Sequence, residues 1–338
     1  MVGVAILCFC LACILSITTS VDMANSAKLL KKLIQFVIFF WVANSVQEEK
    51  QRSLLVVLVI ASGVAAALGG VTPLLFDGSS DTFTEGIKGT LSKQSTYSGV
   101  LMLAGLMALA RCLFHKPKAY WVIGSIGLIV FAILCSLARQ AWLGFFIGVV
   151  FLMFFWNKKY LLILPLILLS LFLVSPDGIQ KRVLSFKNIN DLSLQYRLDI
   201  WKGGWKIFKD YPLTGCGYKC VDSIHHQYPD HKLLEHFVGM HSNIFQLLVD
   251  TGFVGFGAWI FIWIIYFKEF FRRLRGLAEK TYRENSKGLL MGSSAAVLAY
   301  LVAGLFETSI YDSEVSMLLY FLMGLSLSKV TKAPKVVT

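Results

Sequence analysis

Arg139 and His241 are polar side chains whose placement beside apolar segments favours chemistry. Arg139 lies between two apolar segments, in Ser-Leu-Ala-Arg-Gln-Ala-Trp, and no lysine or acid shares its turn. An arginine at a membrane boundary often only extends toward lipid headgroups, but a lone cation beside a cavity is a functional candidate. His241 directly precedes an apolar segment, which places its imidazole at a membrane surface. A single histidine there is more often structural, yet the side chain suits a general base near neutral pH.

Arg197 opens a segment whose apolar residues recur at spacings of three and four as far as Phe208. This spacing predicts an amphipathic helix at the membrane surface, on which Trp201 follows Arg197 by one turn and Trp205 by two. The sequence Asp-Tyr-Pro-Leu-Thr-Gly-Cys-Gly comes next. Its Gly215 and Gly217 predict a tight turn whose backbone amides approach a ligand. A plain surface helix and turn is the alternative, and the spacing favours neither.

Cysteines and histidines show no metal-ligand pattern. Five of the seven cysteines lie in or next to apolar segments. Cys216 and Cys220 lie in a long polar segment, where a disulfide and two free thiols both remain open. The same segment holds four histidines, without the spacing of two histidines flanking a glutamate that a zinc site requires: His225, His226, His231 and His236. The sequence therefore predicts neither a metal nor another cofactor.

The composition is that of a membrane protein. Of the 338 residues, 56% are hydrophobic and 15% charged, whereas about a quarter of the residues of a soluble domain are charged. Because a helix satisfies its own peptide groups, apolar runs of about 20 residues predict membrane-spanning helices. A net charge of +12 would indicate nucleic acid in a soluble domain, but these basic residues lie in the connections, so we expect no nucleic-acid partner. Ten helices are predicted: 2–18, 33–46, 53–75, 97–110, 119–138, 141–156, 160–174, 243–267, 288–306 and 314–329.

The distribution of basic residues predicts the orientation in the membrane, because cytoplasmic connections retain lysine and arginine. One set of alternate short connections holds seventeen lysines and arginines, and the other set holds six. Both termini are therefore expected in the cytoplasm. The chain divides into seven helices in 1–174, a periplasmic loop with an amphipathic helix in 175–240, and three helices in 241–338. The first helix is expected to be retained, because no basic residues precede it as in a signal peptide.

The pattern of these residues resembles that of the O-antigen ligase family of bacterial polysaccharide enzymes. Related Wzy-type polymerases share this pattern. Three segments carry the resemblance: 136–142 around Arg139, 197–217 from the arginine to the paired glycines, and 241–255 with its histidine, aromatic, glutamine, acid and glycine. The resemblance covers about residue 50 to the C-terminus. Ser242 stands where the family usually has asparagine, and Gly239 where many ligases have a further histidine. Members of the family tend to have about twelve spans, so with ten predicted helices the chain is expected to be two helices short at its N-terminal end.

The resemblance implies a GT-C-like glycosyltransferase of lipopolysaccharide biosynthesis in the bacterial inner membrane, with its site facing the periplasm. Such an enzyme moves a glycan from undecaprenyl pyrophosphate to a hydroxyl of the lipid A core without a metal. Arginine forks stabilise the charge that develops on the pyrophosphate, and a histidine accepts the proton of the hydroxyl. The implied catalytic residues are Arg139, Arg197 and His241, and the implied substrate-binding residues are Arg139, Arg197, Trp201, Gly215 and Gly217.

Three hypotheses remain. A ligase transfers finished O-antigen to the lipid A core, and a ligase that glycosylates protein is a minor variant of it. A polymerase uses the same carrier-linked donor but adds it to another carrier-linked chain. A transporter would place polar residues near mid-membrane, whereas the spans predicted here are nearly free of charge, so we rank it last. The arginine and histidine matches favour the ligase.

Overall fold

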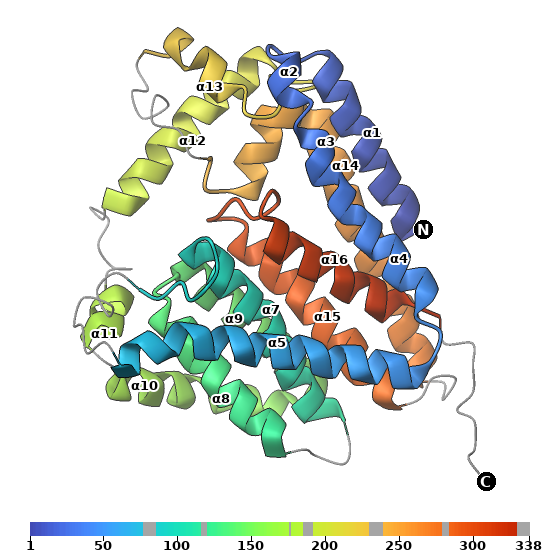
Figure 1. Cartoon of the computed structure of the whole chain (residues 1–338), viewed down its shortest axis with the longest axis vertical. Helices are drawn as coiled ribbons and strands as arrows, with labels where there is room; N and C mark the ends of the chain where they lie inside the picture. Colours follow the sequence, from blue (N-terminus) through green and yellow to red (C-terminus); the bar gives the residue numbers. More distant parts are fainter. Residues whose placement is uncertain are drawn as a thin grey trace. The chain divides into compact units, whose positions relative to one another are not determined.

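The computed structural model describes residues 1–76, 86–115, 120–175, 177–184, 192–229, 239–278 and 284–329. Within these ranges every regular element is a helix and no strand is present (Figure 1). The prediction of an all-α chain is therefore confirmed. The helices belong to two compact units, each assembled from segments that are distant in the sequence.

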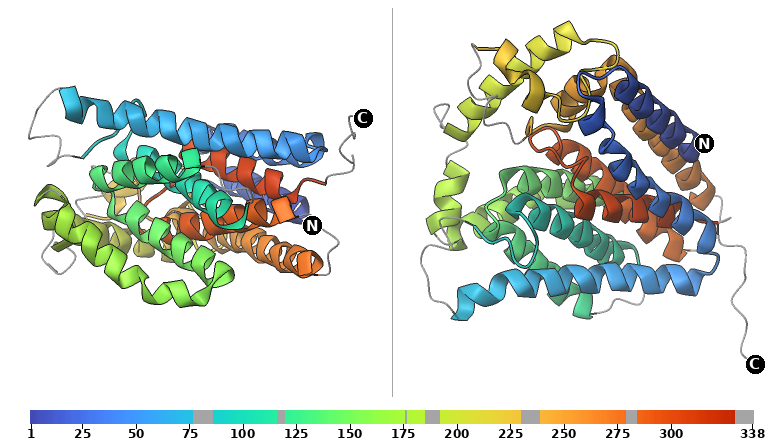
Figure 2. Two further views of the ribbon diagram at one scale, coloured as in Figure 1. Left: turned by 90° about the horizontal axis from the view of Figure 1, so that it is seen from below. Right: turned by 45° about the horizontal axis from the view of Figure 1, so that its top comes forward.

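The first unit comprises Met1–Val37, Asn188–Arg273 and Gly304–Ser313. Figure 1 and the right-hand view of Figure 2 both show α1 beside α14, and the Ser16 hydroxyl donates to the carbonyl oxygen of Asp250 at 2.7 Å. Buried apolar side chains of α12, α13 and α14 form a common core. The elements of this unit are α1 (Val2–Thr18), α2 (Met23–Ser26), α3 (Leu29–Leu33), η1 (Ile34–Phe36), α12 (Leu192–Asp210), α13 (Val221–Ile224), η4 (His225–Gln227) and most of α14 (Asn243–Ala278).

The second unit comprises Ile38–Lys187, Leu274–Ala303 and Glu314–Thr338. Helix α7 forms its centre, because most side chains of α7 are buried. Glycines allow other helices to approach α7 closely: a Cβ on Gly63 would lie 2.6 Å from Cβ of Ala104. The elements are α4 (Val37–Ser45), α5 (Glu49–Phe76), α7 (Gln94–Phe114), α8 (Tyr120–Cys135), α9 (Arg139–Trp156), η2 (Lys158–Leu162), α10 (Leu164–Val174), α11 (Asp177–Leu184), α15 (Glu284–Ala303) and α16 (Ser313–Leu327).

All ten segments predicted to span the membrane contain helix. Among the described residues, five helical segments are long and apolar enough to cross a membrane by length and composition: Glu49–Leu74, Gln94–Phe114, Arg139–Trp156, Asn243–Leu277 and Ser286–Ala303. Helices α1, α8 and α16 are apolar but shorter. The chain thus has the helices of a membrane protein, while ten spans and the orientation of the 175–240 loop stay predictions.

The described part of the 175–240 loop contains the helices α11, α12, α13 and η4. The amphipathic helix predicted from Tyr196 to Lys209 lies within α12 and buries Ile200, Ile207 and Phe208. Trp205, on its predicted apolar face, is 46% exposed. The buried side chains of α12 pack toward Met240 and Val249, and a contact of Trp205 with the membrane surface stays a prediction.

Candidate functional site

Helix α14 is interrupted at Gly252, just after the predicted histidine segment. Gly252 has φ 60° and ψ −162°, a region of backbone conformation that is essentially restricted to glycine. A Cβ there would lie 2.3 Å from the carbonyl oxygen of Leu213. The interruption therefore requires glycine for both conformation and space.

The turn 212–217 forms the hydrogen bonds that the interrupted helix loses. In an unbroken helix, two N–H groups after the kink would bond to two carbonyl groups one turn earlier. All four groups bond to the turn instead, so the turn and α14 form one rigid backbone unit. The bonds run from Cys216 N–H to Val249 O (2.9 Å), Gly217 N–H to Asp250 O (3.1 Å), Phe253 N–H to Pro212 O (2.9 Å) and Val254 N–H to Leu213 O (3.0 Å).

This arrangement accounts for the paired glycines of the turn. Gly215 and Gly217 are buried with φ of 72° and 103°. A Cβ on Gly215 would lie 2.4 Å from the backbone of α14. The amides of Cys216 and Gly217 thus bond to α14, and a direct contact of either glycine with substrate stays a prediction. The structure joins Cys216 to Cys220 by a disulfide, which selects one of the two alternatives that the sequence leaves open.

His241 lies at the amino end of α14 with a carboxylate beside it. Its backbone is left-handed, with φ 47°. The imidazole Nδ1 lies 3.7 Å from a carboxylate oxygen of Glu307, and the two side chains are 29% and 22% exposed. Among the described residues, Nδ1 has no hydrogen-bond partner. The ring also contacts the edge of Tyr196 on α12, at 6.0 Å between centroids. The imidazole is therefore accessible and next to a group that can orient it.

Asn243 ties the segment that carries Glu307 to the start of α14. Its side-chain oxygen accepts hydrogen bonds from the backbone N–H groups of Ser309 (2.8 Å) and Ile310 (3.0 Å). Its own backbone N–H donates to the carbonyl of Gly304 at 2.7 Å. These bonds flank Glu307 in the chain on both sides, so Asn243 positions the carboxylate that approaches His241.

The backbone of Met240, the residue before His241, is held by hydrogen bonds to Trp201 and Gln246. The indole N–H of Trp201 donates to the carbonyl oxygen of Met240 at 2.7 Å, and the side-chain oxygen of Gln246 accepts from the Met240 N–H at 3.0 Å. Trp201 also stacks on Phe245, with ring centroids 5.2 Å apart. Trp201 therefore holds the backbone beside His241, and its contact with substrate stays a prediction.

Arg197 belongs to the same unit as His241. It is half-buried on α12 and directly follows Tyr196, whose ring contacts His241. Residues four apart share a face of a helix, so Arg197 lies one turn before Trp201 on the same face of α12. The structure thus gathers Arg197, Trp201, Gly215, Gly217 and His241 in its first unit.

Arg139 lies in the second unit, as the first residue of α9. The break before it is well defined: Leu137 has φ 53°, and the indole N–H of Trp142 donates to the carbonyl of Ile133 at 2.8 Å. The amino end of a helix carries partial positive charge. Arg139 adds its own charge there, an arrangement that favours an anion. That Arg139 and Arg197 share one pyrophosphate stays a prediction.

Glu307 and Tyr196 belong to the site but were not predicted from the sequence. Glu307 follows a long apolar helix, as any acid at a helix end does, and only its approach to His241 distinguishes it. Among the described residues, no three His, Cys, Asp or Glu side chains gather as metal ligands would. Two of the loop histidines, His231 and His236, lie outside the described residues.

Comparison with known proteins covers this same part of the chain. Residues 124–260 match a family model described as O-Antigen ligase, a range that includes all six predicted site residues. An uncharacterized protein of Haemophilus influenzae strain Rd is 30% identical over 158 residues, which are 40% of this chain and 40% of that protein. The alignment thus spans less than half of the relative. Residues 124–260 of the chain are therefore similar to the O-antigen ligase family.

Proposed function

We propose that this protein is a glycosyltransferase that moves O-antigen glycan from undecaprenyl pyrophosphate to a hydroxyl of the lipid A core, without a metal. The observation that carries this proposal is the pairing of His241 with Glu307, 3.7 Å from Nδ1. A carboxylate at Nδ1 favours the tautomer with the proton on that nitrogen. The other ring nitrogen, Nε2, is then left to accept a proton from an attacking hydroxyl.

The reaction balances without a further reactant. The acceptor hydroxyl gives its proton to Nε2 of His241 as its oxygen attacks the anomeric carbon. The bond from that carbon to the pyrophosphate oxygen breaks, and the electron pair leaves with the pyrophosphate. Arg139 and Arg197 stabilise this charge, because guanidinium groups offer paired donors to phosphate oxygens.

Backbone strain supports the same assignment. Among the described residues, the non-glycine residues with positive φ are Leu137, Lys219 and His241. One of these is the proposed base, and another lies two positions before Arg139. Such conformations cost about 1–3 kcal/mol and persist where the surrounding structure enforces them, often at active sites.

A deletion strain tests the ligase against the polymerase hypothesis. Loss of a ligase should leave long glycan chains on the lipid carrier and none on the lipid A core. Loss of a polymerase should instead leave the core capped with a single repeat unit. We expect the first pattern in the lipopolysaccharide profile, with restoration by the wild-type gene and not by a His241→Ala gene. A core capped with a single repeat unit would refute the ligase hypothesis. The proposed chemistry of the carrier-linked donor would still apply, because a polymerase uses the same donor.

A further inference from the structure

A second cluster of titratable side chains lies in the second unit and includes none of the residues assigned above. Helices α5, α7 and α15 surround a pocket lined by Glu49, Arg52, Arg111, His115 and Gly288, together with apolar neighbours. The lining contains two guanidinium groups, one imidazole and one carboxylate. The pocket therefore has an excess of positive charge.

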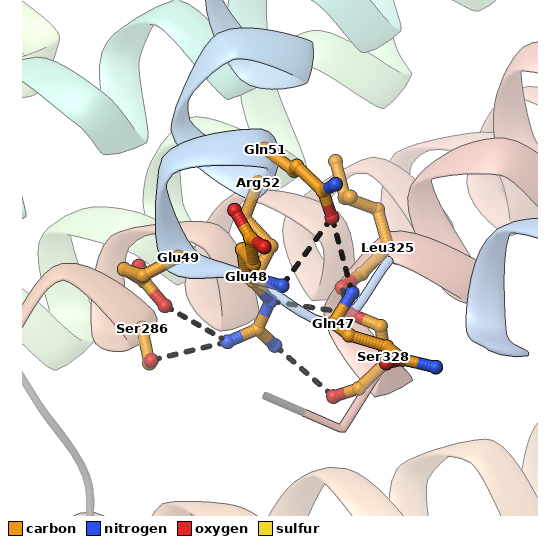
Figure 3. Close-up of polar contacts among 8 residues, drawn as sticks. All are labelled: Gln47, Glu48, Glu49, Gln51, Arg52, Ser286, Leu325 and Ser328. Carbon is orange, nitrogen blue, oxygen red and sulfur yellow. Dashed lines mark hydrogen bonds and ion pairs between the residues drawn. The ribbon is translucent and has the colours of Figure 1, made fainter. Parts of the chain in front are cut away.

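Within this cluster, the guanidinium group of Arg52 has both an ion-pair partner and hydrogen-bond partners (Figure 3). Its side chain is only 4% exposed and pairs with Glu49 at 3.3 Å. It also donates to the hydroxyl of Ser286 at 3.3 Å and to the hydroxyl of Ser328 at 3.1 Å. Arg52 therefore ties the start of α5 to α15 and to the end of α16, and its charge is already compensated by Glu49.

Arg111 lacks this compensation. Its Nε is buried and has no hydrogen-bond partner among the described residues, and no carboxylate in the described ranges forms an ion pair with it. A buried donor without a partner is costly and rare in folded proteins. The donor belongs to a cation that lines a pocket, so its missing partner is expected to be an anion.

The pKa of His115 is lowered in part by the same positive charge. Burial lowers its pKa, the charge of Arg111 lowers it further, and Glu49 opposes both. The side chain also lines the pocket. An anion bound near Arg111 would reverse the effect of the guanidinium on this imidazole.

We propose that the pocket binds one phosphate-class anion, with the guanidinium of Arg111 as its principal charge partner. A planar guanidinium offers paired donors that match phosphate oxygens. The headgroup of an anionic phospholipid and free phosphate share this chemistry. The site is separate from the proposed transfer reaction, because none of its lining residues takes part in that reaction.

The titration of His115 in the full-length protein tests this site. The imidazole resonance is followed by NMR in phosphatidylcholine nanodiscs, with inorganic phosphate or with chloride at equal ionic strength, and is assigned with His115→Gln. Phosphate should raise the pKa of His115 by about 1, as a nearby opposite charge does. Arg111→Gln should weaken phosphate binding by about tenfold or more.

Two further variants separate the site from general effects. Lys287→Gln removes a neighbouring cation whose ammonium lies over the ring of Phe114, and the response to phosphate should persist. Gly288→Leu fills the lining without changing charge, because a Cβ there meets Phe114 and Ala110 only at ordinary contact distances. The response should then be lost, even if Arg111→Gln fails to fold.

Nanodiscs that contain phosphatidylglycerol distinguish the two sources of the anion. A pKa of His115 that rises in these discs without added phosphate, and only when Arg111 is present, identifies a lipid headgroup. A rise only with added phosphate identifies the free ion. No rise under either condition, or a rise that persists in Arg111→Gln, would overturn the proposal.

Discussion

His241 and Arg52 each lie beside a glutamate, yet the two pairs differ in how completely they are bonded. Arg52 is 3% exposed as a residue and contacts Glu49 at 3.3 Å, with one serine partner on α15 and another just after α16. His241 lies 3.7 Å from Glu307, and both side chains remain partly exposed. A fully bonded buried cation fixes helices to one another, whereas an accessible imidazole with one oriented nitrogen keeps the other for a reactant.

This difference predicts that stability depends on the Arg52 pair and activity on the His241 pair. The two properties can be measured on the same purified protein, so single substitutions can separate them.

Replacing Arg197 with alanine should abolish glycan transfer, and Arg139→Ala should do the same, because the leaving pyrophosphate would lose a charge partner. Lysine at either position should rescue poorly, since it keeps the charge but loses the paired donors. Transfer is measured with purified carrier-linked donor and acceptor. Lys202→Ala, which removes an exposed cation from the same helix as Arg197, is the control and should retain activity. Full activity of Arg197→Ala would remove that residue from the site.

His241→Ala should slow transfer by about a hundredfold to ten-thousandfold, the usual contribution of general acid–base catalysis. Donor binding and unfolding stability should stay close to those of the wild type. The exposed His226 provides a matched control, and His226→Ala should transfer normally. Loss of donor binding in His241→Ala would make this residue a positioning group instead of a base.

Glu307→Gln should lower kcat by less than His241→Ala does, because the base remains but loses its orienting charge. The KM for the donor should not change, and Glu307→Asp should recover part of the rate. Steady-state kinetics of the three proteins provide the comparison, with the exposed Glu314 changed to Gln as the control. Equal rates for Glu307→Gln and wild type would show that the carboxylate does not assist His241.

Arg52→Met should destabilise the protein by roughly 3 kcal/mol, because Glu49 loses its partner and two serines lose a charged donor. The folded fraction should transfer glycan at the wild-type rate. Denaturant unfolding in detergent measures the first quantity, and Lys50→Gln, at an exposed position, is the control. If Arg52→Met is as stable as wild type but inactive, the contrast between the two pairs is wrong.

The sequence by itself located the helices, because helix formation depends on short-range periodicity and on apolar length. All ten predicted segments are helical, and α12 lies where spacings of three and four placed it. The same local pattern places Trp205 on the apolar face of α12, where the structure leaves it 46% exposed. Periodicity shows which residues share a face, and only the packing partner determines how wide the buried part of that face is.

The tertiary structure decided which distant groups meet. Glu307 approaches His241 only because Asn243 bonds to the backbone of residues that are 66 and 67 positions later in the chain. The turn 212–217 could be predicted from its glycines, but not its hydrogen bonds to the kink at Gly252. The sequence also could not show that Arg111 has no charge partner among the described residues, because a charge lacks a partner only with respect to its neighbours in space. Such pairings depend on where helices cross, and local sequence preferences do not encode that.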